Sequence, residues 1–247
     1  MNDTQFFPAG NTAALICAVN TLRRQGNSIC TRPEDADCLL LPVPSFTPDG
    51  AIQGGGSLSE LLEKLPKNVT VLGGNLDRPE LAGYSTIDLL KDPAYLAKNA
   101  MITAHCAIRL AMNNLPVILE GCPTLIIGWG RIGKCLARLL KQLGADVTLA
   151  ARKESDRAVL SALGYRAIGI ENLDTLPYRL IFNTAPEMVA PYCPGDGLKI
   201  DLASKLGLGS TDVIWARGLP GKDAPESSGN LIAQTIISKL QGKEFTA

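Results

Sequence analysis

Short runs of apolar residues alternate with amphipathic stretches along most of this chain. The runs Asp37–Pro44 and Val69–Gly74 are almost wholly apolar and are closed by proline or glycine, which is typical of buried strands. Around them, Ala13–Gln25 and Leu58–Leu65 have the apolar spacing of helices. Because strands that alternate with helices usually form a parallel sheet covered on both faces, the pattern predicts an α/β fold.

The clearest unit of this kind is a β-α-β unit in the middle of the chain. The pattern predicts a strand over Pro123–Ile127, a helix over Ile132–Leu143 and a second strand over Val147–Ala151. Further elements are predicted by short apolar runs at 166–168, 180–183, 198–202 and 213–216 and by helical spacing at 230–240. The second half of the chain is therefore expected to form a Rossmann-type doubly wound parallel sheet.

Two lobes are expected, because a whole set of strands and helices precedes the β-α-β unit. Residues 1–97 would form an N-terminal flavodoxin-like α/β domain, and residues 98–225 the Rossmann-type domain. The C-terminal helix, 226–247, is expected to fold back onto the first lobe. A helical stretch from Asp92 to about Asn114, with a break near Asn99, would join the lobes, with a cofactor in the cleft between them.

Composition narrows the class of protein. The 247 residues are 46% hydrophobic, enough for a core, and 24 Lys and Arg balance 24 Asp and Glu. A neutral chain gives no electrostatic reason to bind nucleic acid or an anionic membrane, and no apolar run is long enough to span a bilayer. Seven cysteines without a C-x-x-C pair, a single histidine and no secretory signal favour a cytoplasmic protein without a metal site.

A glycine-rich turn, Gly128–Gly133, joins the first strand of the β-α-β unit to its helix. It has the G-x-G-x-x-G spacing of dinucleotide-binding proteins, and it lies in the strand–turn–helix context that the motif requires. A pyrophosphate would be met by the helix N-terminus. The turn predicts a cofactor site made by Gly128, Trp129, Gly130, Arg131, Ile132 and Gly133. Arg131 either reaches the pyrophosphate or points to solvent.

The residues after the second strand of this unit favour NADP over NAD. Asp146 has the spacing of the acid that binds the ribose of NAD, but it precedes its strand and so lies at the wrong end of the sheet. At the carboxyl end, Arg152 and Lys153 offer donors for a 2′-phosphate. The alternative is that both are ordinary solvated charges. NAD is thus the less favoured cofactor.

Two later strands end in polar residues on the same edge of the sheet. Asn183 and Thr184 follow one strand and are expected to face the nicotinamide ribose. Asp201 and Ser204 follow the next and would act in the same way. The alternative is that all four are turn formers.

Several motifs together resemble the family of the A subunit of dipicolinate synthase, a bacterial sporulation enzyme. These stretches are Asn99–Ile108, Ile126–Gly133, Ala151–Lys153, Ile181–Pro186, Ile200–Lys205 and Gly218–Pro225, with looser matches at Leu40–Pro44 and Gly73–Gly74. Departures occur at His105 and Cys106, where the family has an acid and a glycine, and after Lys205, where the family has Pro-Gly-Gly.

The resemblance implies an NADP-dependent dehydrogenase that converts a dihydropyridine dicarboxylate to dipicolinate. It also implies a partner, a second, flavoprotein-like subunit, and we expect the chain to form a homo-oligomer. In this setting His105 would be a general base or hold a substrate carboxylate, and Lys205 would bind a carboxylate. The alternative for each, an ordinary packed or surface residue, stays open. Gly218–Gly221 and Ser227–Gly229 would form a wall of the cleft, a hinge or plain turns.

Two other functions fit parts of the sequence. A shikimate-dehydrogenase-like reductase shares the two-lobe plan, and Asn183–Pro186 resembles its Asn-Thr-x-Pro motif, but the catalytic Lys–Asp pair of that family has no match in the first lobe. A non-catalytic, NADP-binding sensor or scaffold protein is kept open by the substitution at His105.

Overall fold

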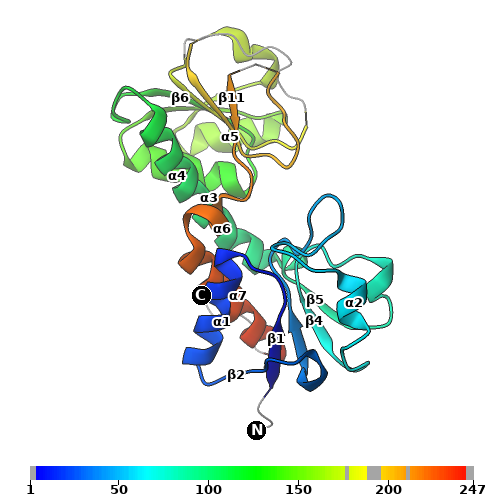
Figure 1. The fold of residues 1–247 in the computed structure, drawn as a ribbon. Coiled ribbons are helices and arrows are strands. Elements are labelled where there is room, and N and C mark those ends of the chain that lie inside the picture. The colour runs from blue at the N-terminus through cyan, green and yellow to red at the C-terminus, as the bar shows by residue number, and fades with distance from the viewer. Residues whose placement is uncertain (1–3, 176–177, 188–195, 210–211, 243–247) are drawn as a thin grey trace. The chain divides into compact units, whose positions relative to one another are not determined.

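The chain folds into two compact units, each built on its own parallel sheet (Figure 1). A computed structural model describes residues 4–175, 178–187, 196–209 and 212–242. The first unit contains the residues up to Asn99 together with those from Pro220 onward, and the second unit contains Ala100–Leu219.

The first unit has a five-stranded sheet. Its strands are β1 Gln5–Pro8, β2 Ser28–Ile29, β3 Cys38–Leu40, β4 Thr70–Gly73 and β5 Ser85–Asp88. They are parallel and lie in the order β2-β1-β3-β4-β5, which is the flavodoxin-like order, so the predicted class of this domain is confirmed. All of β3 and all but the first residue of β4 are buried, which accounts for their strong sequence pattern. Most residues of β1, β2 and β5 are half-buried or exposed, and these strands gave no such pattern.

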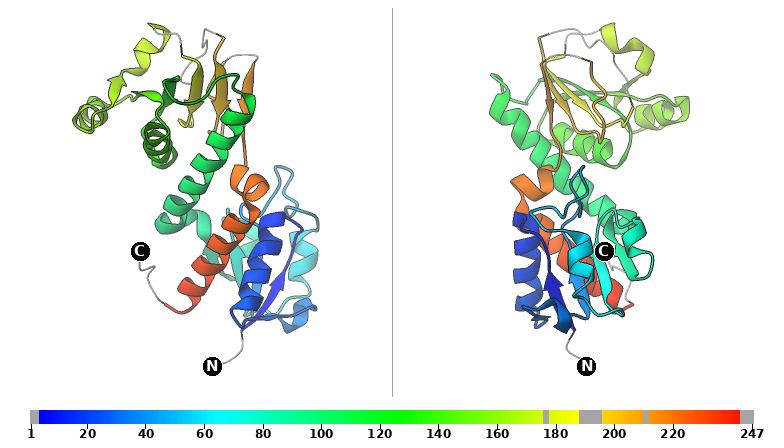
Figure 2. Two further views of the ribbon diagram at one scale, coloured as in Figure 1. Left: turned by 90° about the vertical axis from the view of Figure 1, so that its left-hand side faces the viewer. Right: turned by 45° about the vertical axis from the view of Figure 1, so that its right-hand side comes forward.

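Two helices far apart in the sequence pack side by side in this unit, α1 (Ala13–Arg24) and α7 (Pro225–Leu240), as both views of Figure 2 show. A Cβ atom added at Gly229 would lie 2.5 Å from Cβ of Cys17 and 2.6 Å from the carbonyl oxygen of Ala14. The helices therefore touch backbone to backbone. The apolar spacing of the last helix begins only at Asn230, but the helix itself begins at Pro225, which suits a first turn and lies one residue before the expected segment 226–247. Ser227–Gly229 therefore belong to the helix rather than to a turn or hinge.

Helix α3 (Pro93–Asn114) begins in the first unit and continues into the second. Asp92 precedes it, and its carboxylate accepts a hydrogen bond from the amide of Tyr95 at 2.6 Å. The expected break near Asn99 was wrong, because the helix runs without interruption. A single asparagine costs a helix well under about 1 kcal/mol, and the buried residues on both sides of it, Tyr95 and Ala104, outweigh that cost.

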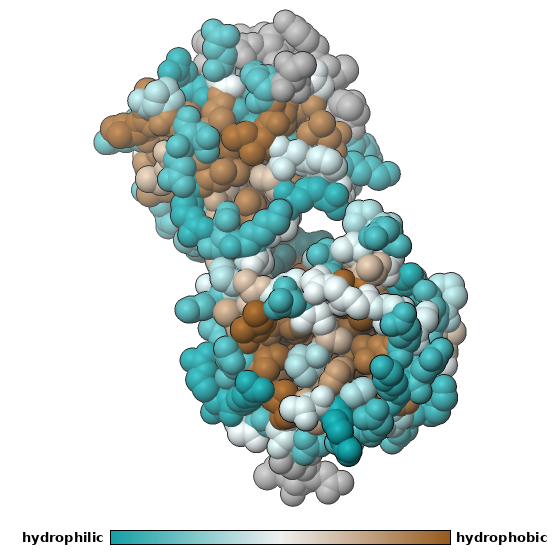
Figure 3. Space-filling model, in the orientation of Figure 1, coloured by the Kyte–Doolittle hydropathy of each residue, from teal (hydrophilic) through white to brown (hydrophobic). Residues whose placement is uncertain are grey.

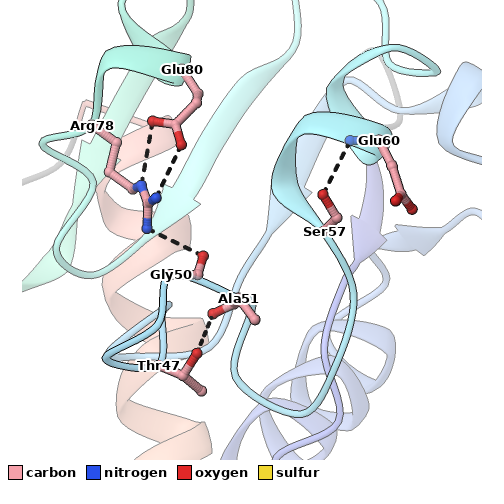
Figure 4. Close-up of polar contacts among 7 residues, drawn as sticks. All are labelled: Thr47, Gly50, Ala51, Ser57, Glu60, Arg78 and Glu80. Atoms are coloured by element: carbon pink, nitrogen blue, oxygen red, sulfur yellow. Dashed lines mark hydrogen bonds and ion pairs between the residues drawn. The ribbon is translucent and has the colours of Figure 1, made fainter.

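A loop at the carboxyl end of the first sheet, Phe46–Ser57, is held in place by Arg78 (Figure 4). The guanidinium of Arg78 lies 4.5 Å from the ring of Phe46, donates to the carbonyl of Gly50 at 3.3 Å and pairs with Glu80 at 3.0 Å. Ser57 then caps the short helix α2 (Leu58–Leu62) by accepting from the amide of Glu60. The guanidinium of Arg78 is thus part of the structure of this loop.

The second unit has a six-stranded parallel sheet. Its strands are β6 Pro123–Ile127, β7 Asp146–Ala150, β8 Arg166–Ile168, β9 Leu180–Asn183, β10 Leu198–Asp201 and β11 Val213–Trp215. In order of appearance along the chain, the sheet reads 3-2-1-4-5-6, the doubly wound order of dinucleotide-binding proteins, so the predicted Rossmann-type sheet is confirmed. The strand order reverses between β6 and β9, which marks the place where such sheets bind ligands.

The remaining helices are short or lie between strands. They are α4 Arg131–Gln142, α5 Glu154–Ala162, α6 Leu219–Asp223 and the 3-10 helices η1 Pro33–Asp35, η2 Pro79–Leu81, η3 Leu89–Lys91 and η4 Ile170–Thr175. Because helices cover the sheet, most residues of β6, β7 and β9 are fully buried.

Candidate cofactor site

The turn between β6 and α4 is built around glycines that fill separate steric roles. Gly128 has a φ of 104°, which side-chain-bearing residues rarely adopt. A Cβ atom at Gly133 would lie 2.1 Å from the carbonyl oxygen of Gly128, so only glycine lets α4 pack this closely on the turn. At Gly130 an added Cβ atom would meet no atom within 4 Å. The backbone at Gly130 is therefore open to a ligand, as the fingerprint requires of its second glycine.

The N-terminus of α4 suits an anion. Gly130 is its N-cap residue, no side chain caps the helix, and its first turn contains no acid. The amides at a helix N-terminus and the positive end of the helix dipole attract phosphate groups. A pyrophosphate thus fits the residues present at this turn.

A cavity of about 450 Å³ opens beside this turn. It lies at the carboxyl ends of β6, β7 and β9, where the strand order reverses. Its walls are formed by residues 128–130, 151–153 and 184–187, with Asp156 of α5 and Ile170 of η4. Three segments that the sequence singled out therefore meet at one cavity.

The two cations predicted to bind a 2′-phosphate line this cavity. Arg152 and Lys153 follow β7 and are exposed to solvent. Nη1 of Arg152 lies 3.0 Å from Oε2 of Glu187, which also lines the cavity. Asp146 is the first residue of β7 and so stands at the amino end of the sheet, away from the ribose position. No sequence signal pointed to Glu187, because its approach to Arg152 depends on the strand order.

Thr184 ties β9 to β6 at the point of reversal. Its hydroxyl donates to the carbonyl of Ile127 at 2.9 Å, and its amide bonds to the same carbonyl at 2.8 Å. Thr184 also lines the cavity. Of the strand-end residues, Thr184 is the one placed at the cavity, and its side chain is engaged in holding the turn.

Asn183 and Asp201 lie behind this wall and are fully buried. The Asp201 carboxylate accepts hydrogen bonds from the side chain of Asn183 at 2.9 Å and from the amides of Ala203 at 2.9 Å and Gly207 at 2.8 Å. In this structure the pair anchors the loop after β10 and does not line the cavity. Ser204, in that loop, is exposed and also lies outside the cavity wall.

The other residues of the fingerprint differ in their surroundings. Trp129 lines the cavity, and its ring is tilted against that of Tyr165 with 6.3 Å between centroids. Arg131 is exposed and Ile132 is half-buried at the start of α4, and neither lines the cavity.

The two candidate catalytic residues are not among those that form the wall of this cavity. His105 is exposed on α3, and Lys205 is exposed in the loop after β10. Neither lines the cavity, and each was singled out by residue type and resemblance alone. In the described ranges the structure brings together no group of three or more metal-binding side chains. Nor is any helix in those ranges long and apolar enough to cross a membrane.

Comparisons with known sequences and structures both find the A subunit of dipicolinate synthase. No family model matches the chain. The A subunit of dipicolinate synthase from Bacillus subtilis strain 168 is 24% identical in an alignment that covers 94% of this chain and 83% of the relative. The structure of the dipicolinate synthase A subunit from Bacillus halodurans has a TM-score of 0.84 at 20% identity, and covers 98% of this chain and 99% of that one.

The crystal structure of the corresponding dipicolinate synthase chain from Bacillus subtilis gives a TM-score of 0.77 at 21% identity, with 98% of this chain and 97% of that chain covered. These likenesses extend to the first lobe, where the sequence motifs were loose. The resemblance to the A subunit of dipicolinate synthase that the motifs predict is therefore confirmed over nearly the whole chain.

Proposed function

We propose that this protein is an NADP-dependent dehydrogenase similar to the A subunit of dipicolinate synthase, and that it oxidises a dihydropyridine dicarboxylate to dipicolinate. One observation carries the proposal: the Gly128–Gly133 turn and the uncapped end of α4 face a cavity at the reversal point of a doubly wound sheet. The resemblance to dipicolinate synthase supplies the substrate class.

The chain's own residues would hold the coenzyme from one end to the other. The amides at the start of α4 and the open backbone of Gly130 would bind the pyrophosphate. Arg152 and Lys153 would bind the 2′-phosphate, Arg152 through its planar fork and Lys153 as a point charge. Thr184 would keep the turn rigid beside the ribose. Asn183 and Asp201 would act indirectly by fixing the loop that follows β10.

Oxidation of a dihydropyridine removes a hydride and a proton from the ring and leaves it aromatic. The oxidised nicotinamide, when bound, supplies the hydride acceptor. The protein must then orient the ring and provide a route for the proton, and aromatisation drives the reaction toward product. We assign the proton transfer to His105 and carboxylate binding to Lys205, both of which are exposed to solvent.

The protein would work with a flavoprotein-like second subunit in the cytoplasm and associate with further copies of itself. Support for subunit contacts comes from apolar side chains at the surface, which gather between hydrophilic ones on the face drawn in Figure 3. At the end of α3, Met112 is 58% exposed, and Ile118 soon after it is 74% exposed. These are single exposed apolar side chains of a kind that an interface can cover.

The test is an absorbance assay for reduced nicotinamide. The purified protein is mixed with NADP and freshly prepared dihydrodipicolinate, with and without the second subunit. We expect turnover with NADP, and we expect Arg152→Ala to lose far more affinity for NADP than for NAD. An equal loss for both coenzymes would remove the assignment of Arg152.

Two outcomes would favour the competing functions. Tight NADP binding without turnover, even with the second subunit, would identify a sensor or scaffold protein. One observation favours that alternative: His105 and Lys205 do not line the cavity. Turnover with shikimate would identify a reductase of the shikimate dehydrogenase type.

A further inference from the structure

The strongest feature outside the fingerprint is the ion pair across the cavity. Arg152 follows β7 and Glu187 follows β9, and both line the cavity. Their side chains are 72% and 68% exposed, with Nη1 of Arg152 3.0 Å from Oε2 of Glu187. A 2′-phosphate bound by Arg152 would thus come next to a carboxylate, and like charges at this range repel each other.

The backbones that carry the two side chains are both held in place. Nη1 of Arg157 donates to the carbonyls of Ala151 at 2.9 Å and of Arg152 at 2.8 Å. On the other wall, an added Cβ at Gly207 would lie 2.5 Å from the carbonyl oxygen of Glu187, so the Glu187 backbone sits closely on the loop that Asp201 anchors. Both side chains of the pair therefore extend from backbone segments that make defined contacts with the rest of the second unit.

The charges on the cavity wall cancel. Its charged residues are two cations, Arg152 and Lys153, and two acids, Asp156 and Glu187. A 2′-phosphate adds up to two negative charges, whereas the 2′-hydroxyl of NAD is neutral and can donate a hydrogen bond to a carboxylate. Glu187 thus disfavours binding of the phosphorylated ribose of NADP and favours the unphosphorylated ribose of NAD. Arg152 favours the phosphorylated ribose.

We propose that Glu187 is a specificity-determining residue, which competes with the 2′-phosphate for Arg152 and so reduces the preference for NADP over NAD. The inference rests on the proposed function, because it needs a nicotinamide dinucleotide in this cavity. It adds a residue to the site that neither the fingerprint nor the resemblance assigns. The acid lets one cavity accept both coenzymes.

The test is a pair of titrations with NADPH and NADH, followed by nicotinamide fluorescence, for the wild type and for Glu187→Gln. Glutamine keeps the size of the side chain and removes its charge. Since the pair is exposed, we expect the Kd for NADPH to fall about three- to fivefold, and the Kd for NADH to stay the same or rise. The gain for NADPH should shrink at high salt.

Glu120→Gln is the matched control, because it removes the same charge from an exposed residue before β6, at the amino end of the sheet. Equal effects of the two substitutions, or an unchanged ratio of the two Kd values in Glu187→Gln, would overturn the role of Glu187 while leaving the coenzyme site in place. If the wild type bound neither coenzyme, the proposed function itself would fall, and the role of Glu187 with it. Thermal unfolding of each variant checks that it is folded.

Discussion

At the scale of single residues, the glycines of the β6–α4 turn serve different purposes: Gly133 is needed for packing and Gly130 for binding a ligand. Gly133 is enclosed by the turn, with the carbonyl oxygen of Gly128 2.1 Å from where a Cβ would stand, whereas Gly130 faces open space with an ordinary φ of −81°. A methyl group added at Gly133 should therefore affect stability, and one added at Gly130 should affect ligand binding.

We expect Gly133→Ala to lower the stability of the second unit by about 1–3 kcal/mol, because α4 must move off the turn. Gly130→Ala should leave stability nearly unchanged but weaken NADPH binding, because its methyl group would project where the pyrophosphate approaches. Chemical denaturation measures the first effect and NADPH titration the second. If Gly130→Ala bound NADPH as tightly as the wild type does, the assignment of the pyrophosphate site to this turn would be wrong.

Residue identities were enough to predict the glycine turn, whereas the roles of His105 and Lys205 stay predictions. The glycines are demanded by local backbone geometry, which is written into a few consecutive positions. Glu187 could not be found in this way, because it reaches Arg152 only after β9 is placed beside β6. His105 and Lys205 were chosen for their titratable or charged groups, and nothing in a linear sequence shows which cavity a side chain faces.

At the scale of elements, the contact between α1 and α7 depends on a missing side chain. Gly229 lies in the interior of α7, and an added Cβ would be 2.6 Å from the amide nitrogen of Ala18 as well as 2.5 Å from Cβ of Cys17. Glycine normally weakens a helix interior by about 0.5–1 kcal/mol relative to alanine. Its presence here is explained by the close approach of the two helices.

Gly229→Ala should therefore destabilise the first unit, by about 1–3 kcal/mol, in spite of the better helix propensity of alanine. Gln234→Ala is the control, because Gln234 is exposed on the same helix. Urea unfolding followed by circular dichroism gives both values. A more stable Gly229→Ala protein would show that the helices can separate without cost.

Buried apolar strands such as β6, β7 and β9 were predicted from sequence, whereas β1, β2 and β5, which are half-buried or partly exposed, were not. The β6-α4-β7 unit has long apolar runs and a strongly amphipathic helix, so local pattern was enough. Strand β2 has two residues, and β5 begins with the exposed Ser85 and Thr86. Such strands are defined by pairing with a neighbour, which is a property of the fold and not of the segment.

At the scale of the whole molecule, an ion pair joins the start of α3 to the last turn of α7. Lys239 bonds to Asp92, whose side chain is 8% exposed. Burial alone would raise the pKa of the Asp92 carboxyl, but the bond to Lys239 and the amides of Tyr95 and Ala94 hold that pKa below its usual range. The charged form is thus favoured by folding.

A lowered pKa in the folded state gives stability that is present above the unfolded pKa of about 3.9 and is lost as the pH falls through the folded pKa. We expect Asp92→Asn to be less stable than the wild type at pH near 7 and to lose less stability on acidification. Urea unfolding at a pH near 7 and again at acidic pH measures the two free energies of unfolding. Asp77→Asn is the control, since Asp77 is 93% exposed and lies 3.8 Å from Lys91; an identical pH profile for the two variants would contradict the role of Asp92.

The split of the first unit along the chain dictates an order of events during synthesis. When a ribosome has translated as far as Leu219, every strand and helix of the second unit has been made, while α1 still lacks the helix against which it packs. The first helix to be translated is thus the last to be covered, and until α7 has been made the nascent chain exposes the side of α1 on which α7 packs. Chaperones that bind uncovered segments of nascent chains would therefore have to protect α1 for longer than any helix of the second unit.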